Sequence, residues 1–250
     1  MTRLLPRLTL PLLALAALPA AAQDAAPDPA AKYAQCMELA ETRPDRAWEL
    51  AGQWAGLAGG EPARHCQAVA LIGLGEYAEA ATRLEKLAEV SRAAEALRAG
   101  MLAQAAQAWL MADNAERAYA VQSTALELLP GDPALLTDRA LTLVEAGDVR
   151  GAIDDLTRVL DARPRDAGAL ALRASAFRMA GDPVPARADL DRALSIDPAH
   201  PAALLEKGIL ARQSGDVATA RAAWLALLDA APDSPEADTA RAHLQVMDGG

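Results

Sequence analysis

Two cysteines and a histidine are the residues of this chain whose types could support redox or metal chemistry. The cysteines are Cys36 and Cys66, and His65 stands directly before the second. Neighbours in a helix point about 100° apart, so His65 and Cys66 do not form a ligand pair by adjacency. An even pair of cysteines is typical of a disulfide in an oxidising compartment. Free thiols and a redox or metal role are the alternatives.

Paired carboxylates are the second feature with chemical potential. The segments 154–155 (DD) and 189–191 (DLD) have the residue types of a metal site. They stand close to Arg158, Arg187 and Arg192, and on helices this spacing favours intrahelical ion pairs. No glycine-rich phosphate loop follows a strand, and no serine has a plausible nearby histidine. We therefore expect no catalytic residue, no metal site and no cofactor.

The first 22 residues have the composition of a secretory signal peptide. Arg3 and Arg7 precede the apolar stretch 8–18, and the small residues that follow allow cleavage after Ala22. The apolar stretch is too short to cross a bilayer comfortably, although a retained N-terminal anchor is the alternative. The sequence thus predicts export across the inner membrane to the periplasm, with no stable membrane insertion after cleavage.

The charge of the chain excludes some classes of partner. Residues 1–22 hold two of the 24 basic and none of the 34 acidic groups, so the remainder has a net charge of −12. An acidic, exported chain is a poor candidate for binding nucleic acid or an anionic membrane surface. A protein partner is expected, and we expect the chain itself to be a monomer.

Small residues recur along the chain at a nearly fixed spacing, and the composition favours helices. Aromatic residues make up only 3% of the chain, whereas alanine, leucine, glutamate and arginine are abundant. The recurring alanines are separated by 38, 34, 34 and 34 residues, and a proline follows the last four of them after twelve residues. The alanines are Ala80, Ala118, Ala152, Ala186 and Ala220, and the prolines are Pro130, Pro164, Pro198 and Pro232.

Each part of the repeated pattern has a structural role. Gly147, Gly181 and Gly215 can enter the left-handed region that ends a helix, and the aspartate after each can cap the next helix. Pro183 suits a first helical turn, where no amide donor is lost. The alanine lets two helices approach closely, and the later proline ends the second helix. The sequence therefore predicts stacked pairs of helices.

This pattern resembles the tetratricopeptide repeat, a 34-residue pair of antiparallel helices. The third unit carries the resemblance as Leu136, Ala140, Leu143, Ala152, Leu156, Val159 and Pro164, and the fourth as Leu170, Ala174, Phe177, Ala186, Leu190, Ala193 and Pro198. The resemblance implies an all-α fold, a right-handed α-solenoid with a C-terminal capping helix. An ordinary helical bundle is the alternative.

The repeat divides the chain into predicted segments. An irregular helix pair precedes the regular units, and its register places Cys36 and Cys66 on the first helices of adjacent units, where a disulfide would join them. The segments are 1–22 (signal peptide), 23–31 (flexible), 32–60 (degenerate helix pair), 61–98, 99–132, 133–166, 167–200 and 201–232 (five repeats), and 233–250 (capping helix and tail).

The resemblance also implies a binding surface. Repeats of this family commonly hold an extended peptide or a helix in the concave groove that their first helices line. The groove residues expected here are mostly apolar, which is typical of an interface. The alternative is that they belong to the core, covered by the curvature of the stack or by the N-terminal unit. They are Leu110, Met111, Leu141, Val144, Arg178, Met179, Leu205, Ile209 and Arg212.

The function implied is that of a non-catalytic adaptor in the periplasm, in envelope assembly or secretion. The family's carboxylate-clamp subgroup uses Lys and Asn at successive groove positions, and this chain has neither at those places, so a clamp is not supported. The alternative function is an enzyme or enzyme subunit with a site in the irregular N-terminal region.

Overall fold

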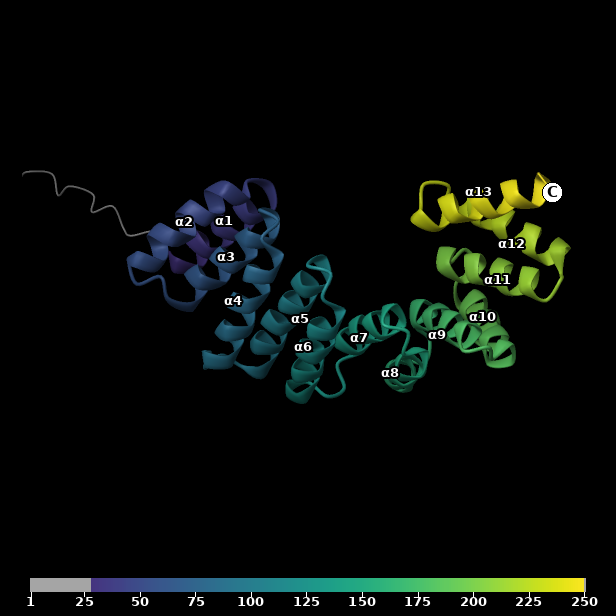
Figure 1. Ribbon diagram of the computed structural model, residues 1–250, viewed down its shortest axis with the longest axis horizontal. Helices are drawn as coiled ribbons and strands as arrows, with labels where there is room; N and C mark the ends of the chain where they lie inside the picture. The colour runs from purple at the N-terminus through teal and green to yellow at the C-terminus, as the bar shows by residue number, and fades with distance from the viewer. Residues whose placement is uncertain (1–27, 250) are drawn as a thin grey trace, which may run out of the picture.

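The computed structural model describes residues 28–249, which fold into α-helices packed as successive antiparallel pairs. Figure 1 shows the helices following one another along an arch, with α7 and α9 toward its inner side and α8 toward its outer side. The helices are α1 (Pro29–Thr42), α2 (Pro44–Gly56), α3 (Gly60–Gly73), α4 (Tyr77–Val90), α5 (Glu95–Met111), α6 (Ala115–Leu128), α7 (Pro133–Glu145), α8 (Val149–Ala162), α9 (Ala167–Met179), α10 (Pro183–Ile196), α11 (Pro201–Gln213), α12 (Val217–Ala230) and α13 (Pro235–Asp248). The predicted all-α solenoid is confirmed.

The predicted period is visible in the helix boundaries. The odd-numbered helices α7, α9, α11 and α13 begin at intervals of 34 residues, and so do the even-numbered helices α6, α8, α10 and α12. The longer interval of 38 residues is explained by α5, which has 17 residues where α7, α9 and α11 have 13. α5 therefore begins inside the predicted segment 61–98. α1 begins at Pro29, so residues 29–31 are helical rather than flexible, and the predicted signal peptide lies outside the described residues.

From α3–α4 onward, the turn within each helix pair is set by the residue types that the repeat places there. Gly75, Gly147, Gly181 and Gly215 all have φ between 80° and 83°, the left-handed conformation that ends a helix without strain. In the third helix pair, Asp113 takes the same place with φ 56°. The predicted role of Gly147, Gly181 and Gly215 is confirmed.

The aspartate caps follow the prediction at two of three turns. Asp148 and Asp216 each accept a hydrogen bond from the backbone N–H three residues later. Asp182 makes no such bond, because the residue three places later is Pro185, which has no N–H. Its carboxylate instead lies 3.0 Å from the guanidinium of Arg150 in the preceding unit.

The core of the solenoid is made by small residues at the helix crossings. The five repeated alanines are all fully buried, and one continuous apolar cluster runs from Ala68 to Leu210. A second cluster joins the last pair to α13, where Trp224 is fully buried and stacks on His243 with ring centroids 4.7 Å apart. α13 thus covers the apolar end of the stack, as expected of a capping helix.

Two buried ion pairs repeat with the same period. Arg139 of α7 makes two hydrogen bonds of 2.7 Å to Asp155 of α8, and Arg173 of α9 bonds Asp189 of α10 at 2.7 and 2.9 Å. Both aspartates are only 3% exposed. Each arginine also donates to a hydroxyl of the preceding unit, which links three helices.

These pairs correct the interpretation of the acidic segments. The predicted intrahelical partners Arg158 and Arg192 do lie 3.6 and 3.5 Å from Asp155 and Asp189, but at the exposed side of the pair. The closer partners are the interhelical arginines. Arg187 makes no ion pair within residues 28–249.

Candidate functional site

All nine predicted groove residues lie on α5, α7, α9 and α11, and the concave groove is defined here as the surface formed by these four helices. The largest exposed apolar side chains among them are Met111, Leu141 and Met179, which are 44%, 44% and 47% exposed. They stand on three successive odd-numbered helices. Large apolar side chains that are exposed on successive helices are typical of an interface.

Four other apolar groove residues are half-buried. Leu110 and Val144 pack against the main core, and Leu205 and Ile209 pack against the C-terminal cluster. The predicted set therefore contains both exposed surface residues and residues that are partly buried in the contact between units. Only part of each of these side chains is available to a partner.

The two arginines of the predicted set differ in their surroundings. Arg178 is held by Glu206 of α11, with its Nε 2.7 Å from the carboxylate, and both side chains are less than 20% exposed. Its charge is already neutralised, so it offers little to a partner's carboxylate. Arg212 is exposed and lies with Nη1 3.4 Å from Nδ1 of His243.

A hollow of about 220 Å³ in the concave groove, between α5 and α7, brings two predicted residues together. Leu110 and Leu141 line it, with Gln107 beside them. The sequence analysis missed Asp138 and Glu145, which also line it. The signal was present, because residues 138, 141 and 145 are spaced i, i+3 and i+7 and share one face of a helix.

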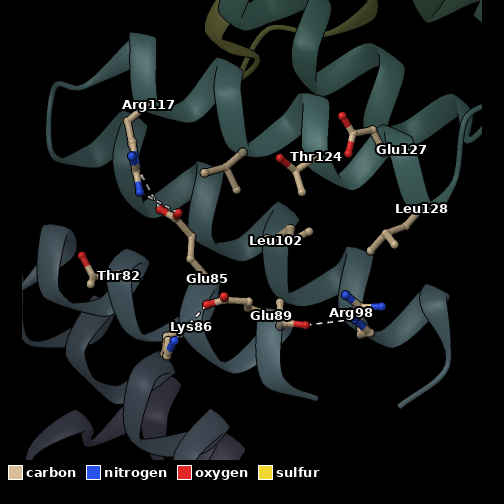
Figure 2. Close-up of a pocket in the computed structure, with 12 residues that line it drawn as sticks. Thr82, Glu85, Lys86, Glu89, Arg98, Leu102, Arg117, Thr124, Glu127 and Leu128 are labelled. Atoms are coloured by element: carbon tan, nitrogen blue, oxygen red, sulfur yellow. Dashed lines mark hydrogen bonds and ion pairs between the residues drawn. The ribbon is translucent and has the colours of Figure 1, made fainter. Parts of the chain in front are cut away.

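A larger hollow of about 480 Å³ lies among α4, α5 and α6 (Figure 2). Its charged groups largely satisfy one another. Glu85 accepts hydrogen bonds from Arg117 and from the indole of Trp109, and Lys86 lies 3.0 Å from Glu89. Arg98 donates to the backbone carbonyl of Ala88 at 2.9 Å. This hollow therefore has few free groups with which to recognise a charged ligand.

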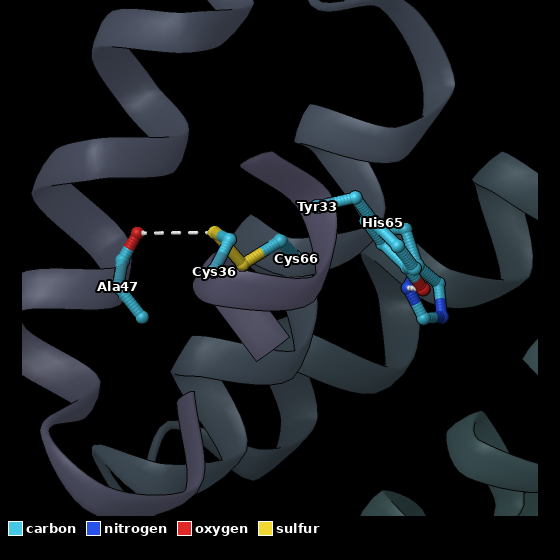
Figure 3. Close-up of a disulfide and its surroundings, with 5 residues drawn as sticks. All are labelled: Tyr33, Cys36, Ala47, His65 and Cys66. Atoms are coloured by element: carbon cyan, nitrogen blue, oxygen red, sulfur yellow. Dashed lines mark hydrogen bonds between the residues drawn. A yellow bond between two sulfur atoms is a disulfide. The ribbon is translucent and has the colours of Figure 1, made fainter. Parts of the chain in front are cut away.

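The disulfide joins Cys36 of α1 to Cys66 of α3, as the repeat register implied (Figure 3). Their Cα atoms are 6.1 Å apart and both residues are fully buried. The sulfur of Cys36 lies 3.8 Å from the carbonyl oxygen of Ala47, so α2 packs over the bond. The cross-link thus holds the irregular N-terminal pair to the next unit.

We expect loss of this disulfide to destabilise the N-terminal end by about 3–4 kcal/mol, because the closed loop restricts the unfolded chain. Replacing both cysteines by serine should lower the urea midpoint of that region, measured by hydrogen exchange of α1–α4. Reductant added to the double variant is the control and should change nothing. Two alkylatable thiols in unreduced protein made in the periplasm would contradict the cross-link.

A chain of polar side chains connects the first three odd-numbered helices beside the disulfide. The hydroxyl of Tyr33 lies 2.8 Å from Nδ1 of His65, and Nε2 of His65 lies 2.7 Å from Oε1 of Gln104. Burial lowers the pKa of His65, which favours the neutral ring. Since Oε1 only accepts, Nε2 carries the proton and Nδ1 accepts from Tyr33. Both ring nitrogens are thus occupied within the chain.

The described part of the chain has neither a cluster of metal ligands nor a membrane-spanning helix. Residues 28–249 contain no group of three or more His, Cys, Asp or Glu side chains that could hold a metal ion. Among the same residues, no helix is sufficiently long and apolar to cross a membrane.

Comparisons with known proteins agree with this architecture. Tetratricopeptide repeat models match residues 106–177 and 177–244, and no curated protein matches the chain by sequence. A tetratricopeptide repeat protein from Parabacteroides merdae shares 18% identity at a TM-score of 0.61, over 87% of this chain and 74% of that one. The structure of Pseudomonas aeruginosa pilF shares 18% identity at a TM-score of 0.60, over 86% and 99%.

A third similar structure is YrrB, a TPR protein with an unusual peptide-binding site. It shares 18% identity at a TM-score of 0.57, over 71% of this chain and 90% of YrrB. At these identities the structural likeness establishes the fold alone. With the repeat models matching more than half of its length, the chain belongs to the tetratricopeptide repeat family, whose repeats typically mediate protein–protein interactions.

Proposed function

We propose that this chain is a non-catalytic adaptor that binds an extended peptide or a helix of a partner protein in the concave groove. The observation that supports this most directly is that Met111, Leu141 and Met179 are large, apolar and exposed on three successive odd-numbered helices. Binding becomes more favourable when a partner removes large exposed apolar side chains from water. YrrB, which has a similar fold, is a precedent for peptide binding by such an array.

The proposal includes export to the periplasm. Support comes from the leader-like segment 1–22 and from the buried Cys36–Cys66 disulfide, since such cross-links form and persist in oxidising compartments. N-terminal sequencing of the chain recovered from a periplasmic fraction checks this part. A mature chain that begins at Gln23 is the expected result, and an uncleaved chain in the cytoplasm would contradict it. Envelope assembly or secretion is the setting that we propose for such an adaptor.

The groove is tested by placing charges on its exposed apolar residues. The triple variant Met111→Asp, Leu141→Asp, Met179→Asp should lose the partner that the unmodified mature chain retains in a pull-down from oxidised periplasmic extract. We expect a loss of at least about 100-fold in affinity, because three carboxylates would have to be desolvated in the interface. These positions are exposed, so the fold should be preserved, as circular dichroism and the urea midpoint would verify.

The matched control places the same charges on even-numbered helices. Val184, Val217 and Leu225 are 79%, 54% and 51% exposed, and they lie on α10 and α12. Their triple change to Asp should leave the partner bound. If the groove variant retains every partner, or if both variants lose the same ones, the groove is not the binding surface.

A further inference from the structure

The hollow between α5 and α7 differs from the rest of the concave groove in its charge. Its ionisable lining groups are Asp138 and Glu145, and neither carboxylate has an ion-pair partner within residues 28–249. No arginine or lysine lines it. Arg139, the neighbour of Asp138 in sequence, is engaged by Asp155 instead. Two negative charges thus face the same small space without compensation.

The negative potential is local rather than a general property of the groove. Glu206 is the acidic residue of α9 and α11, and Arg178 neutralises it. Arg212, farther along the groove on α11, adds positive charge. A cation on a partner would therefore be attracted to the α5–α7 hollow in preference to the other end of the groove.

Asp138 is exposed at the hollow, yet two effects disfavour the negative charge on its carboxylate. Desolvation by its surroundings raises the pKa of Asp138, and the negative charge of Asp132 raises it further. Both effects penalise the charged carboxylate. A positive charge in the hollow would act in the opposite direction and stabilise the ionised form.

Gln122, which also lines the hollow, has a buried acceptor without a partner, and this is a second, independent indication of a donor ligand. Gln122 is 2% exposed, and its Nε2 donates to the carbonyl oxygen of Asp138 and to Oγ1 of Thr142, at 3.2 and 2.9 Å. Because that carbonyl can only accept, the amide orientation is fixed and Oε1 is the free end. Oε1 has no hydrogen-bond partner within the described residues, which is an unfavourable state for a buried oxygen.

The size and walls of the hollow limit the kind of group that fits. About 220 Å³ is below the roughly 300–1,000 Å³ of small-molecule sites, so the hollow suits a single side chain. Leu110 and Leu141 provide apolar wall, along which the methylene stem of a lysine or arginine can lie. The end of that stem carries N–H donors, and both carboxylates can accept hydrogen bonds from them.

We propose that the α5–α7 hollow is a subsite for a lysine or arginine side chain of the partner, whose neighbouring apolar residues cover Met111 and Leu141. The partner segment is then basic and amphipathic rather than acidic. This inference rests on the proposed peptide-binding function of the groove and adds the chemistry of the bound segment.

The experiment uses random twelve-residue peptides displayed on phage and selected against the mature, oxidised chain. We expect selected peptides to be enriched in Lys or Arg next to large apolar residues. Synthetic copies should bind at least about tenfold more weakly to the variant Asp138→Asn, Glu145→Gln, and binding should weaken with added salt. Replacing the Lys or Arg of the peptide by norleucine should have a similar effect.

A matched control is available on the even-numbered helix of the same repeat. Asp154 and Asp161 are exposed, have no ion-pair partner within the described residues, and are seven residues apart, as Asp138 and Glu145 are. The variant Asp154→Asn, Asp161→Asn changes the net charge equally and should bind the peptides normally. This separates a local subsite from general attraction of basic peptides by an acidic chain.

The outcomes distinguish the subsite from the groove itself. Peptides that lose binding to the Met111, Leu141, Met179 triple variant but show no basic enrichment, or bind Asp138→Asn, Glu145→Gln normally, overturn the subsite and leave the groove intact. Equal weakening by the control variant also overturns the subsite. A selection that yields no peptide dependent on the groove residues overturns both proposals.

Discussion

Replacing Asp155 with alanine is expected to lower the free energy of unfolding by about 3–5 kcal/mol, because the change leaves the largely buried guanidinium of Arg139 without its anion. The two side chains share two 2.7 Å hydrogen bonds, and Asp155 is 3% exposed. Urea denaturation followed by circular dichroism measures the loss. Since the pair lies in the middle of the array, the variant should also unfold in two stages rather than one.

A neighbouring aspartate provides the control for this prediction. Asp154 is exposed and makes no ion pair within residues 28–249, so Asp154→Ala should change the stability by no more than about 0.5 kcal/mol. The double variant Arg139→Met, Asp155→Leu should recover much of the loss, because it removes both charges and leaves apolar side chains of similar size. A small effect of Asp155→Ala, comparable with that of Asp154→Ala, would show that the pair does not stabilise the array.

The second large effect is expected at the C-terminal end, where Trp224→Ala should cost about 3–5 kcal/mol. Trp224 is fully buried, stacks on His243 of α13, and donates from its indole to the carbonyl oxygen of Leu205 at 3.3 Å. Removing it leaves a cavity that rigid helices cannot close. Hydrogen exchange should show opening of residues 201–249 before the rest of the chain.

Two further variants test the packing around Trp224. Leu225 is its neighbour in α12 and is 51% exposed, so Leu225→Ala is the control and should have a small effect. A Cβ on Gly208 would lie 2.1 Å from the indole nitrogen of Trp224, so Gly208→Ala alone should cost about 1–3 kcal/mol. In the Trp224→Ala background that methyl group has space, and the two losses should not add. Additive losses would show that Gly208 and Trp224 do not share this contact.

The helices and their order could be predicted from the sequence because the signals for them are local. Gly147, Gly181 and Gly215 end helices through a backbone conformation that is available to each glycine by itself. Pro164 and Pro198 follow the ends of α8 and α10 by two residues, as the restriction on the residue before a proline requires. Such preferences act within a few residues, so they can be identified without knowing the neighbours in space.

The same local reasoning explains where the prediction was wrong. Asp182 carries the residue type of a cap, but Pro185 removes the N–H that it would bind. That outcome was readable from the sequence. The partner of Asp155 was also signalled, since Arg139 and Arg173 are 34 residues apart, as Asp155 and Asp189 are. The intrahelical spacing of Arg158 was given more weight than this recurrence.

The details of the candidate site were decided by packing between helices. The sequence placed Leu110 and Leu141 in the groove, but the hollow that joins them depends on the separation of α5 and α7 and on Gln122 of α6 behind them. Arg178 was predicted as a groove residue, and Glu206, 28 residues away, neutralises its charge. The sequence by itself determined the repeat, the helix ends and the cysteine pair, because each depends on local conformation or on the repeat register. The tertiary structure decided which charges are neutralised and which remain free, because electrostatic pairing depends on distances of a few ångströms between side chains that are remote in sequence.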